Sequence, residues 1–140
     1  MTGFLLDTNC VSEIVRVRPD LNVLTWTRAN EKSLYISVLT LGEIRKGVTL
    51  LPAGRKRVEL EHWLELQLPV QFADRFLSVN AEIAEIWGAT AAEAQRKGIA
   101  LPIIDGLIAA TAKHHDLTIV TRNERDFRVW GIPVMNPWIS

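Results

Sequence analysis

The sequence is poor in the features that stabilise small secreted proteins or place a chain in a membrane. It has one cysteine, Cys10, so an internal disulfide is excluded and a reducing compartment is favoured. No apolar run approaches the ~20 residues of a membrane-spanning helix. The first residues also lack a basic segment followed by an apolar one. We therefore expect a cytoplasmic protein that does not enter a membrane.

Net charge is absent as well. Sixteen Lys and Arg residues balance sixteen Asp and Glu residues, giving a formal charge of zero at pH 7. A basic field over the whole protein, which would attract nucleic acid, is therefore excluded, and any such contact must use local patches. The 140 residues contain no internal repeat, low-complexity tract or linker. We expect a single domain over residues 1–140.

Short apolar runs alternate with helical patterns along the chain. This alternation predicts an α/β domain with a mostly parallel central sheet. Ligands of such sheets gather at the carboxyl ends of the strands, near the point where strand order reverses. The predicted strands are 4–6, 34–37, 76–79, 118–120 and 133–135. The predicted helices are 9–16, 21–29, 41–51, 58–66 (ending before Pro69), 81–97 and 102–115.

Three carboxylates interrupt apolar segments. Asp7 follows the first strand, Glu43 lies among apolar residues and glycines, and Asp105 is the single charge within residues 99–112. Each has an ordinary explanation: Asp7 could cap a helix, Glu43 could lie on an exposed flank, and Asp105 could suit the helix dipole. Most other acidic residues have polar neighbours, which is typical of solvent-exposed faces.

If the sheet brings these three carboxylates together, their mutual repulsion requires a cation. Oxygen ligands suit hard ions such as Mg²⁺ or Mn²⁺. Asn123, which follows the strand at 118–120, would add an amide oxygen to such a cluster, and Asp126 offers a carboxylate nearby. The residues alone leave open which of these two completes the site.

Four segments carry a resemblance to a known family: LLDTNCVSEI, SVLTLGEIRKGV, IIDGLIAATAKHHDLTIVTRN and NPW. In this order and spacing they resemble the PIN-domain ribonucleases, specifically the VapC-type toxins of type II toxin–antitoxin pairs and their FitB-like branch. The resemblance runs from Leu5 to Trp138. It implies an α/β/α sandwich with a parallel sheet, in agreement with the prediction from periodicity.

The resemblance also implies roles for individual residues. Asp7, Glu43 and Asp105 match the family residues that bind Mg²⁺ or Mn²⁺, and Asn123 stands where many members carry a fourth acidic residue. Thr8, Asn9 and Thr121 match family positions beside the metal site that support it. Because Asn123 is neutral, we expect one ion to bind well and a second to bind only together with substrate.

The activity implied is a metal-dependent endoribonuclease that hydrolyses RNA phosphodiester bonds. The partners implied are a small DNA-binding antitoxin, which blocks the acidic site with an inserted residue, often arginine, and a second copy in a homodimer. Exposed faces of 39–51 and 58–66 are candidate antitoxin contacts. The alternative is a catalytically weak PIN-fold protein that acts mainly through its complex with the antitoxin.

Other residue types suggest less. Arg45, Lys46 and Arg122 neighbour the proposed ligands and are candidate RNA or antitoxin contacts. Cys10 is expected to be a small buried residue, and most of the five tryptophans are expected to be core or interface anchors. Solvent-facing positions are expected for His62, His114 and His115.

Overall fold

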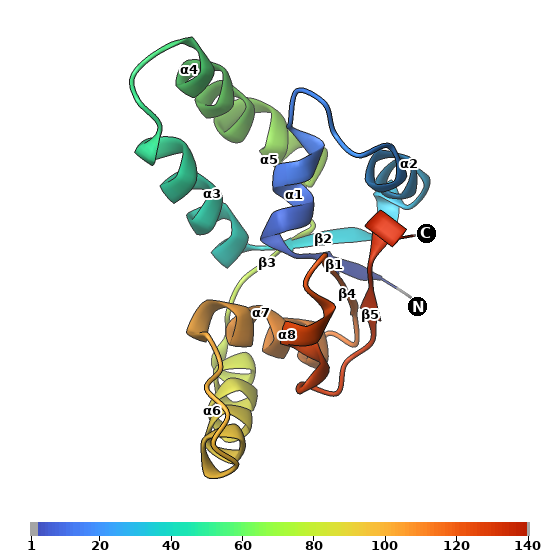
Figure 1. The fold of residues 1–140 in the computed structure, drawn as a ribbon, viewed down its shortest axis with the longest axis vertical. Helices are drawn as coiled ribbons and strands as arrows, with labels where there is room; N and C mark the ends of the chain where they lie inside the picture. The colour runs from blue at the N-terminus through green and yellow to red at the C-terminus, as the bar shows by residue number, and fades with distance from the viewer. Residues whose placement is uncertain (1–2, 140) are drawn as a thin grey trace.

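The computed structural model describes residues 3–139 and contains a five-stranded sheet in the order β3-β2-β1-β4-β5 (Figure 1). Every neighbouring pair is parallel, which confirms the predicted α/β class. The strands are β1 (Phe4–Leu6), β2 (Leu34–Ser37), β3 (Phe76–Leu77), β4 (Thr118–Val120) and β5 (Val134–Met135).

Helices connect the strands and cover both faces of the sheet. The α-helices are α1 (Thr8–Ile14), α2 (Leu21–Ala29), α3 (Val38–Leu50), α4 (Arg55–His62), α5 (Leu68–Gln71), α6 (Ala81–Arg96), α7 (Ile103–His114) and α8 (Glu124–Arg128). Shorter turns are the 3-10 helices η1 (Glu31–Ser33) and η3 (Pro137–Ile139) and the π-helix η2 (Trp63–Gln67). None of the helices in the described part of the chain is long and apolar enough to cross a membrane.

Alternate side chains of the central strands point to opposite faces of the sheet, and helices cover both faces, so both sets of side chains are buried. Leu6 and Val120 belong to a core covered by α1, α3, η2 and α5. Leu5 and Ile119 belong to a second core covered by α6, α7 and α8. Figure 1 shows these two helical layers above and below the sheet. The arrangement is the α/β/α sandwich that the resemblance implies.

Some predicted helix boundaries differ by two or three residues, and the end predicted for the helix over 58–66 is wrong. The helix predicted over 58–66 does not end before Pro69 but continues through η2 into α5, where proline is the second residue. Proline has no N–H to donate and clashes with the carbonyl four residues back. The π turn relieves this conflict because it shifts the hydrogen-bond register, and the Leu68 N–H donates to Trp63, five residues back.

The order of the strands reverses between β1 and β4. The chain builds one half of the sheet from β1 outward to β3 and then crosses to β4 on the other side of β1. The N–H of Asp7, just after β1, donates to the carbonyl of Val120 at the end of β4, at 2.9 Å. Asp7 and Thr121 therefore lie side by side at the switch point, where α/β sheets bind ligands.

Candidate functional site

A polar pocket of about 500 Å³ opens at this switch point. We call it the acidic pocket. Its walls come from the ends of β1 and β4, from α1 and α3, from the start of α7, and from the chain end. The lining residues are Asp7, Thr8, Asn9, Ser12, Glu13, Arg16, Glu43, Asp105, Arg122, Asn123 and Trp138. The three carboxylates singled out from the sequence thus share one pocket.

Asp7 serves both as a helix cap and as a wall of the pocket. Its Oδ1 accepts the Thr8 N–H at 2.8 Å, and its Oδ2 accepts the Thr121 hydroxyl at 2.8 Å. An ionised carboxylate has further lone pairs on both oxygens, so these bonds fix its orientation without exhausting its acceptor capacity. The two explanations of Asp7 from sequence are therefore compatible.

Burial decides the acidity of Asp7. The residue is only 5% exposed, and desolvation is the main cause that raises its pKa to about 6. The hydrogen bonds from Thr121 and Thr8 oppose this rise, whereas the charges of Asp105 and Glu43 add to it. The repulsion that the sequence analysis anticipated among these three carboxylates is present in this geometry.

Glu43 reaches the pocket from α3. Ser37 caps this helix by accepting the Leu39 N–H at 3.1 Å, which starts α3 directly after β2. The Thr8 hydroxyl donates to Glu43 Oε1 at 2.5 Å and lies 3.2 Å from the hydroxyl oxygen of Thr40. Thr8 thereby connects the first carboxylate segment to the second. Such bonds orient a carboxylate without removing its charge.

Asp105 enters from the first turn of α7. The next residue, Gly106, lets this helix pack closely, because a Cβ there would lie 3.0 Å from the side chains of Trp87 and Trp130. Desolvation first, and then the charges of Glu43 and Asp126, raise the pKa of Asp105 above its ordinary value. Asp105 thus interacts electrostatically with Glu43 and Asp7, the other two carboxylates of the pocket.

Thr121 is the hub of the supporting bonds. Its hydroxyl, besides donating to Asp7, accepts the Asn9 side-chain amide at 3.3 Å and the Asn123 N–H at 3.0 Å. The Asn9 side-chain oxygen in turn accepts the Arg122 N–H at 3.4 Å. These contacts tie the turn after β4 to the start of α1, so both segments hold their side chains in one frame.

The structure places the two candidates for completing the site differently. Asn123 is exposed and lines the acidic pocket. Asp126 is exposed on α8, a helix absent from the sequence prediction, and lines a neighbouring depression. Its charge nevertheless raises the pKa of Asp105. Asn123 is therefore the pocket residue, and Asp126 acts on the pocket from outside.

Of the three basic residues proposed from the sequence as RNA or antitoxin contacts, one lines the acidic pocket. Arg122 lines the acidic pocket, with its guanidinium carbon 5.4 Å from the centre of the Trp138 ring. Arg45 forms an ion pair with Glu65 at 3.0 Å, and Lys46 is exposed on α3. Within the described residues, the lining of the acidic pocket includes neither Arg45 nor Lys46.

Ser12, Glu13 and Arg16 also line the pocket, although they were not singled out from the sequence. Glu13 is 5% exposed, so the assignment of the remaining acidic residues to solvent-exposed faces is wrong for this one. It follows Asn9 by four positions on α1, a spacing that places both on one helical face and could have revealed it. Trp138 was expected among the core or interface anchors, yet it also borders the pocket.

Other titratable side chains lie apart from this chemistry. Cys10 is fully buried, its thiol donates to the Val120 carbonyl at 3.1 Å, and burial raises the pKa of the thiol, which makes it a poor nucleophile. As the sequence predicted, His62, His114 and His115 are exposed.

Among residues 3–139, no three Asp, Glu, His or Cys side chains come close enough to hold a metal ion as they stand.

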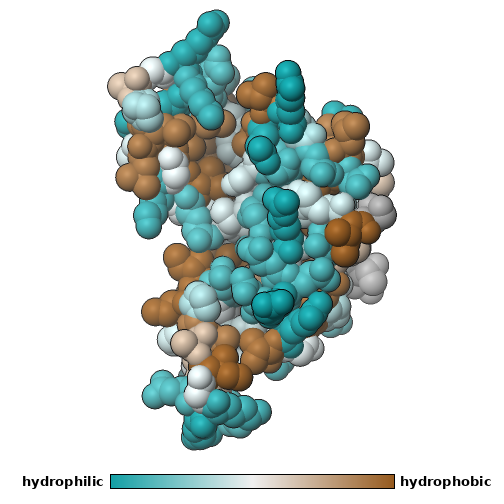
Figure 2. Space-filling model, viewed as in Figure 1, coloured by the Kyte–Doolittle hydropathy of each residue, from teal (hydrophilic) through white to brown (hydrophobic). Residues whose placement is uncertain are grey.

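A second and larger cavity of about 1050 Å³ lies beside the acidic pocket, between α1, α3 and α4. We call it the helical groove. Figure 2 shows hydrophobic side chains between α3 and α4, bordered by hydrophilic ones. The groove is lined by Thr8, Ser12, Ile14, Val15, Arg16, Val17, Arg18, Glu43, Ile44, Gly47, Val48, Leu51, Lys56, Glu59, Leu60, Trp63 and Gln67.

The fold and the pocket together define a class of protein: an α/β/α sandwich whose carboxylates gather at the carboxyl edge of a parallel sheet. Residues 4–131 match the family described as the PIN domain, and the chain belongs to that family. The resemblance to PIN-domain proteins of the VapC and FitB type is thereby confirmed.

Individual relatives cover nearly the whole chain. Over 135 residues it is 38% identical to Toxin FitB of Neisseria gonorrhoeae, covering 96% of this chain and 97% of that protein. It is 34% identical over 135 residues to the VapC ribonuclease Y4jK of Sinorhizobium fredii, covering 96% of each. A solved structure of FitAB bound to an IR36 DNA fragment matches with a TM-score of 0.89 at 36% identity, covering 96% of this chain and 95% of that one.

Proposed function

We propose that this protein is a metal-dependent endoribonuclease that acts as the toxin of a toxin–antitoxin pair. The observation that carries the proposal is the acidic pocket, in which carboxylates from three distant segments share one cavity. Desolvation raises the pKa of Asp7 and of Asp105, and the charge of Glu43 adds to both rises. A relative of this chain is named a VapC ribonuclease, and another is named a toxin. Residues 1–140 are taken as a single PIN domain in the cytoplasm.

Asp7, Glu43 and Asp105 would hold the metal ion. Their donor set consists of carboxylate oxygens, which suits Mg²⁺ or Mn²⁺, and a divalent cation would relieve their repulsion. Asp7 is held in place by Thr8 and Thr121, and Glu43 is oriented by the Thr8 hydroxyl, whereas Asp105 is partly exposed at the start of α7. Two oriented carboxylates would therefore receive the ion, and Asp105 would complete the ligand set.

Hydrolysis of a phosphodiester requires an activated water and compensation for the charge that develops on the phosphate oxygens. A bound divalent ion would lower the pKa of water and neutralise that charge. Thr8 would keep Glu43 oriented, and Thr121 would keep Asp7 oriented through their hydroxyl bonds. Asn123 would contribute a neutral oxygen where a fourth acidic residue is common in the family. Arg122 would face the phosphate backbone from the pocket wall.

The antitoxin is proposed to occupy the helical groove. The groove is largely apolar between α3 and α4, which suits an amphipathic helix of a partner protein. It shares Glu43 with the acidic pocket, so an occupant could extend a basic side chain toward the carboxylates. A solved relative, FitAB, is bound to DNA, in keeping with a DNA-binding antitoxin.

A homodimer is also proposed, with the exposed Ile103 and Ile104 at the start of α7 as candidate contacts.

The test uses Asp7→Asn, which keeps the side-chain shape and the ability to cap a helix but removes the charge. Purified wild type should cleave RNA only with Mg²⁺ or Mn²⁺, and the variant should lose that cleavage. Asp74→Asn is the matched control, because Asp74 is an exposed residue at φ 65°, a conformation that asparagine also adopts. Cleavage by Asp7→Asn at the wild-type rate would sink the proposal.

The alternative is a catalytically weak protein that acts through its antitoxin complex. The neutral Asn123 and the lack of a ready-made metal cluster within residues 3–139 favour it. It predicts that wild type binds the antitoxin and promoter DNA but that metal never elicits cleavage above the level of the Asp7→Asn protein.

A further inference from the structure

Two arginines border the acidic pocket, and each is held by a different neighbour. Arg122, in the turn after β4, lies over the ring of Trp138. Arg16, just beyond α1, donates from Nη1 to Glu13 Oε1 at 3.1 Å. The two cations therefore approach the same pocket from separate segments of the chain.

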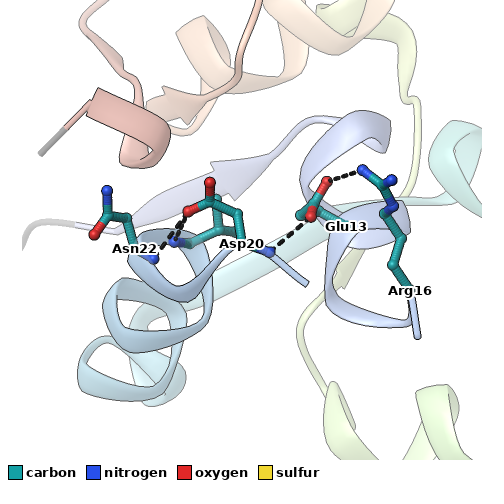
Figure 3. Close-up of polar contacts among 5 residues, drawn as sticks. Glu13, Arg16, Asp20 and Asn22 are labelled. Carbon is teal, nitrogen blue, oxygen red and sulfur yellow. Dashed lines mark hydrogen bonds and ion pairs between the residues drawn. The ribbon is translucent and has the colours of Figure 1, made fainter. Parts of the chain in front are cut away.

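Glu13 is an unusual residue for a seven-residue surface helix, because its side chain is only 6% exposed. Burying a carboxylate is costly unless it is paired or hydrogen-bonded. Its two partners are the Arg16 guanidinium and the N–H of Asp20, which donates to Oε2 at 2.8 Å. Figure 3 shows the carboxylate between these two groups, with Asp20 capping the start of α2.

The Arg16 side chain is 63% exposed, in contrast to its buried partner. An ion pair so open to water contributes little to stability. The buried carboxylate does, however, restrict the rotamers of an arginine that would otherwise lose much side-chain entropy on binding a ligand. The contact with Glu13 uses one edge of the guanidinium, whose planar fork of N–H donors suits phosphate.

The net negative charge of the pocket would repel RNA, so binding requires a positively charged side chain such as Arg16. Four carboxylates (Asp7, Glu13, Glu43 and Asp105) and two guanidinium groups line it, which leaves a net charge of −2 when all are ionised. One divalent ion would bring the sum to zero. An RNA strand would then meet attraction only where a positive group is directed at a phosphate.

We propose that Arg16 binds a phosphate of the RNA strand at the edge of the acidic pocket, and that Glu13 is the positioning residue that holds it there. This inference rests on the proposed ribonuclease function, because it takes RNA as the ligand of the pocket. It adds a substrate contact from the segment between α1 and α2, where the sequence analysis placed none.

The test measures binding and cleavage separately. Fluorescence anisotropy of a labelled single-stranded RNA gives affinity, read on strands that a gel shows to be intact, and initial rates give KM and kcat. Arg16→Ala should weaken RNA binding and raise KM by about 10-fold, as expected for one charge-assisted contact. It should leave kcat within about twofold and reduce the salt dependence of binding by roughly one phosphate contact. Arg16→Lys should restore part of the affinity.

Arg18→Ala is the matched control, since Arg18 is exposed in the same loop and lines the helical groove, with the acidic pocket lined by other residues of the described chain. It should change RNA affinity by no more than about twofold. Glu13→Gln should weaken RNA binding in the wild-type background but not in the Arg16→Ala background, because its effect acts through Arg16. The melting temperature of Glu13→Gln measures separately how much the variant weakens the hydrogen bond that Glu13 accepts from the Asp20 N–H.

Unchanged RNA affinity in Arg16→Ala overturns the inference, including a result in which only antitoxin binding falls. An additive loss from Glu13→Gln in the Arg16→Ala background overturns the positioning role. A wild type that binds no RNA overturns both ideas. A wild type that binds RNA through Arg16 but never cuts it with metal supports the inference and contradicts only the nuclease activity.

Discussion

The acidic pocket and the helical groove share a wall but differ in physical character. Thr8, Ser12, Arg16 and Glu43 line both cavities. On one side of this wall lie buried or partly buried carboxylates, and the pKa values of two of them, Asp7 and Asp105, are raised. On the other side lie mainly aliphatic and aromatic side chains from α3, α4 and η2, such as Leu60 and Trp63.

This difference separates chemistry from recognition. Burying a carboxylate is costly unless it is paired, hydrogen-bonded or bound to a cation, and carboxylates with raised pKa values gather at functional sites. Apolar side chains along a groove gain free energy simply by being covered. Because the wall is shared, an occupant of the groove lies next to Glu43 and Arg16. We therefore expect variants in the pocket to change cleavage, and variants in the groove to change partner binding.

The largest effect is expected in the acidic pocket. Asp105→Asn removes one proposed ligand, and cleavage at saturating Mg²⁺ should fall on the order of 100-fold or more. Titrating metal into wild type and variant, with isothermal calorimetry as the readout, should show weaker binding in the variant. Equal metal affinity in the two proteins would remove Asp105 from the ligand set.

The next effect concerns pH and the metal-free protein. The pKa of Asp7 is raised to about 6 from an ordinary value of 3.8, so the folded protein binds more protons than the unfolded chain between these pH values. The free energy of unfolding should therefore fall as pH rises from about 4 to about 6, by up to roughly 3 kcal/mol from this group. Urea unfolding of wild type and Asp7→Asn in chelator should show this difference, and parallel pH curves would contradict it.

A groove variant should instead affect the partner. Gly47 lines the groove and a Cβ there meets nothing within 4 Å, so Gly47→Arg should fold normally yet obstruct an occupant. Affinity for the proposed antitoxin should fall about 10-fold or more, with RNA cleavage unchanged. Gly42→Arg is the control, because Gly42 lies on the same helix with equal space and outside the described groove lining. Equal losses in both variants would contradict the groove assignment.

The smallest effect is on stability. Gly47→Ala should raise the free energy of unfolding by about 1 kcal/mol, because alanine favours the helix interior over glycine and the added methyl group meets open space. Cleavage should not change. Thermal melts measure the gain, and a destabilised Gly47→Ala protein would show that the groove is narrower than described.

Much of the fold followed from local patterns. The strands β1, β2 and β4 coincide with their predictions because short apolar runs ended at polar residues. The start of α6 was equally predictable, since Asn80 accepts the Ile83 N–H at 2.9 Å. The helix past Pro69 was not, because a π turn depends on packing rather than on proline's local preference. The short α8 was missed as well, since five residues carry little periodicity.

For the site, the sequence by itself determined which side chains were candidates. Asp7, Glu43 and Asp105 stood out because a carboxylate within an apolar segment conflicts with its immediate neighbours, and that conflict is visible over a few residues. Only the tertiary structure decided their surroundings. The bond from Thr121 to Asp7 joins residues 114 positions apart, and the burial of Glu13 depends on the loop that folds Arg16 and Asp20 back upon it. Desolvation and charge coupling act through space, so no local pattern could supply them.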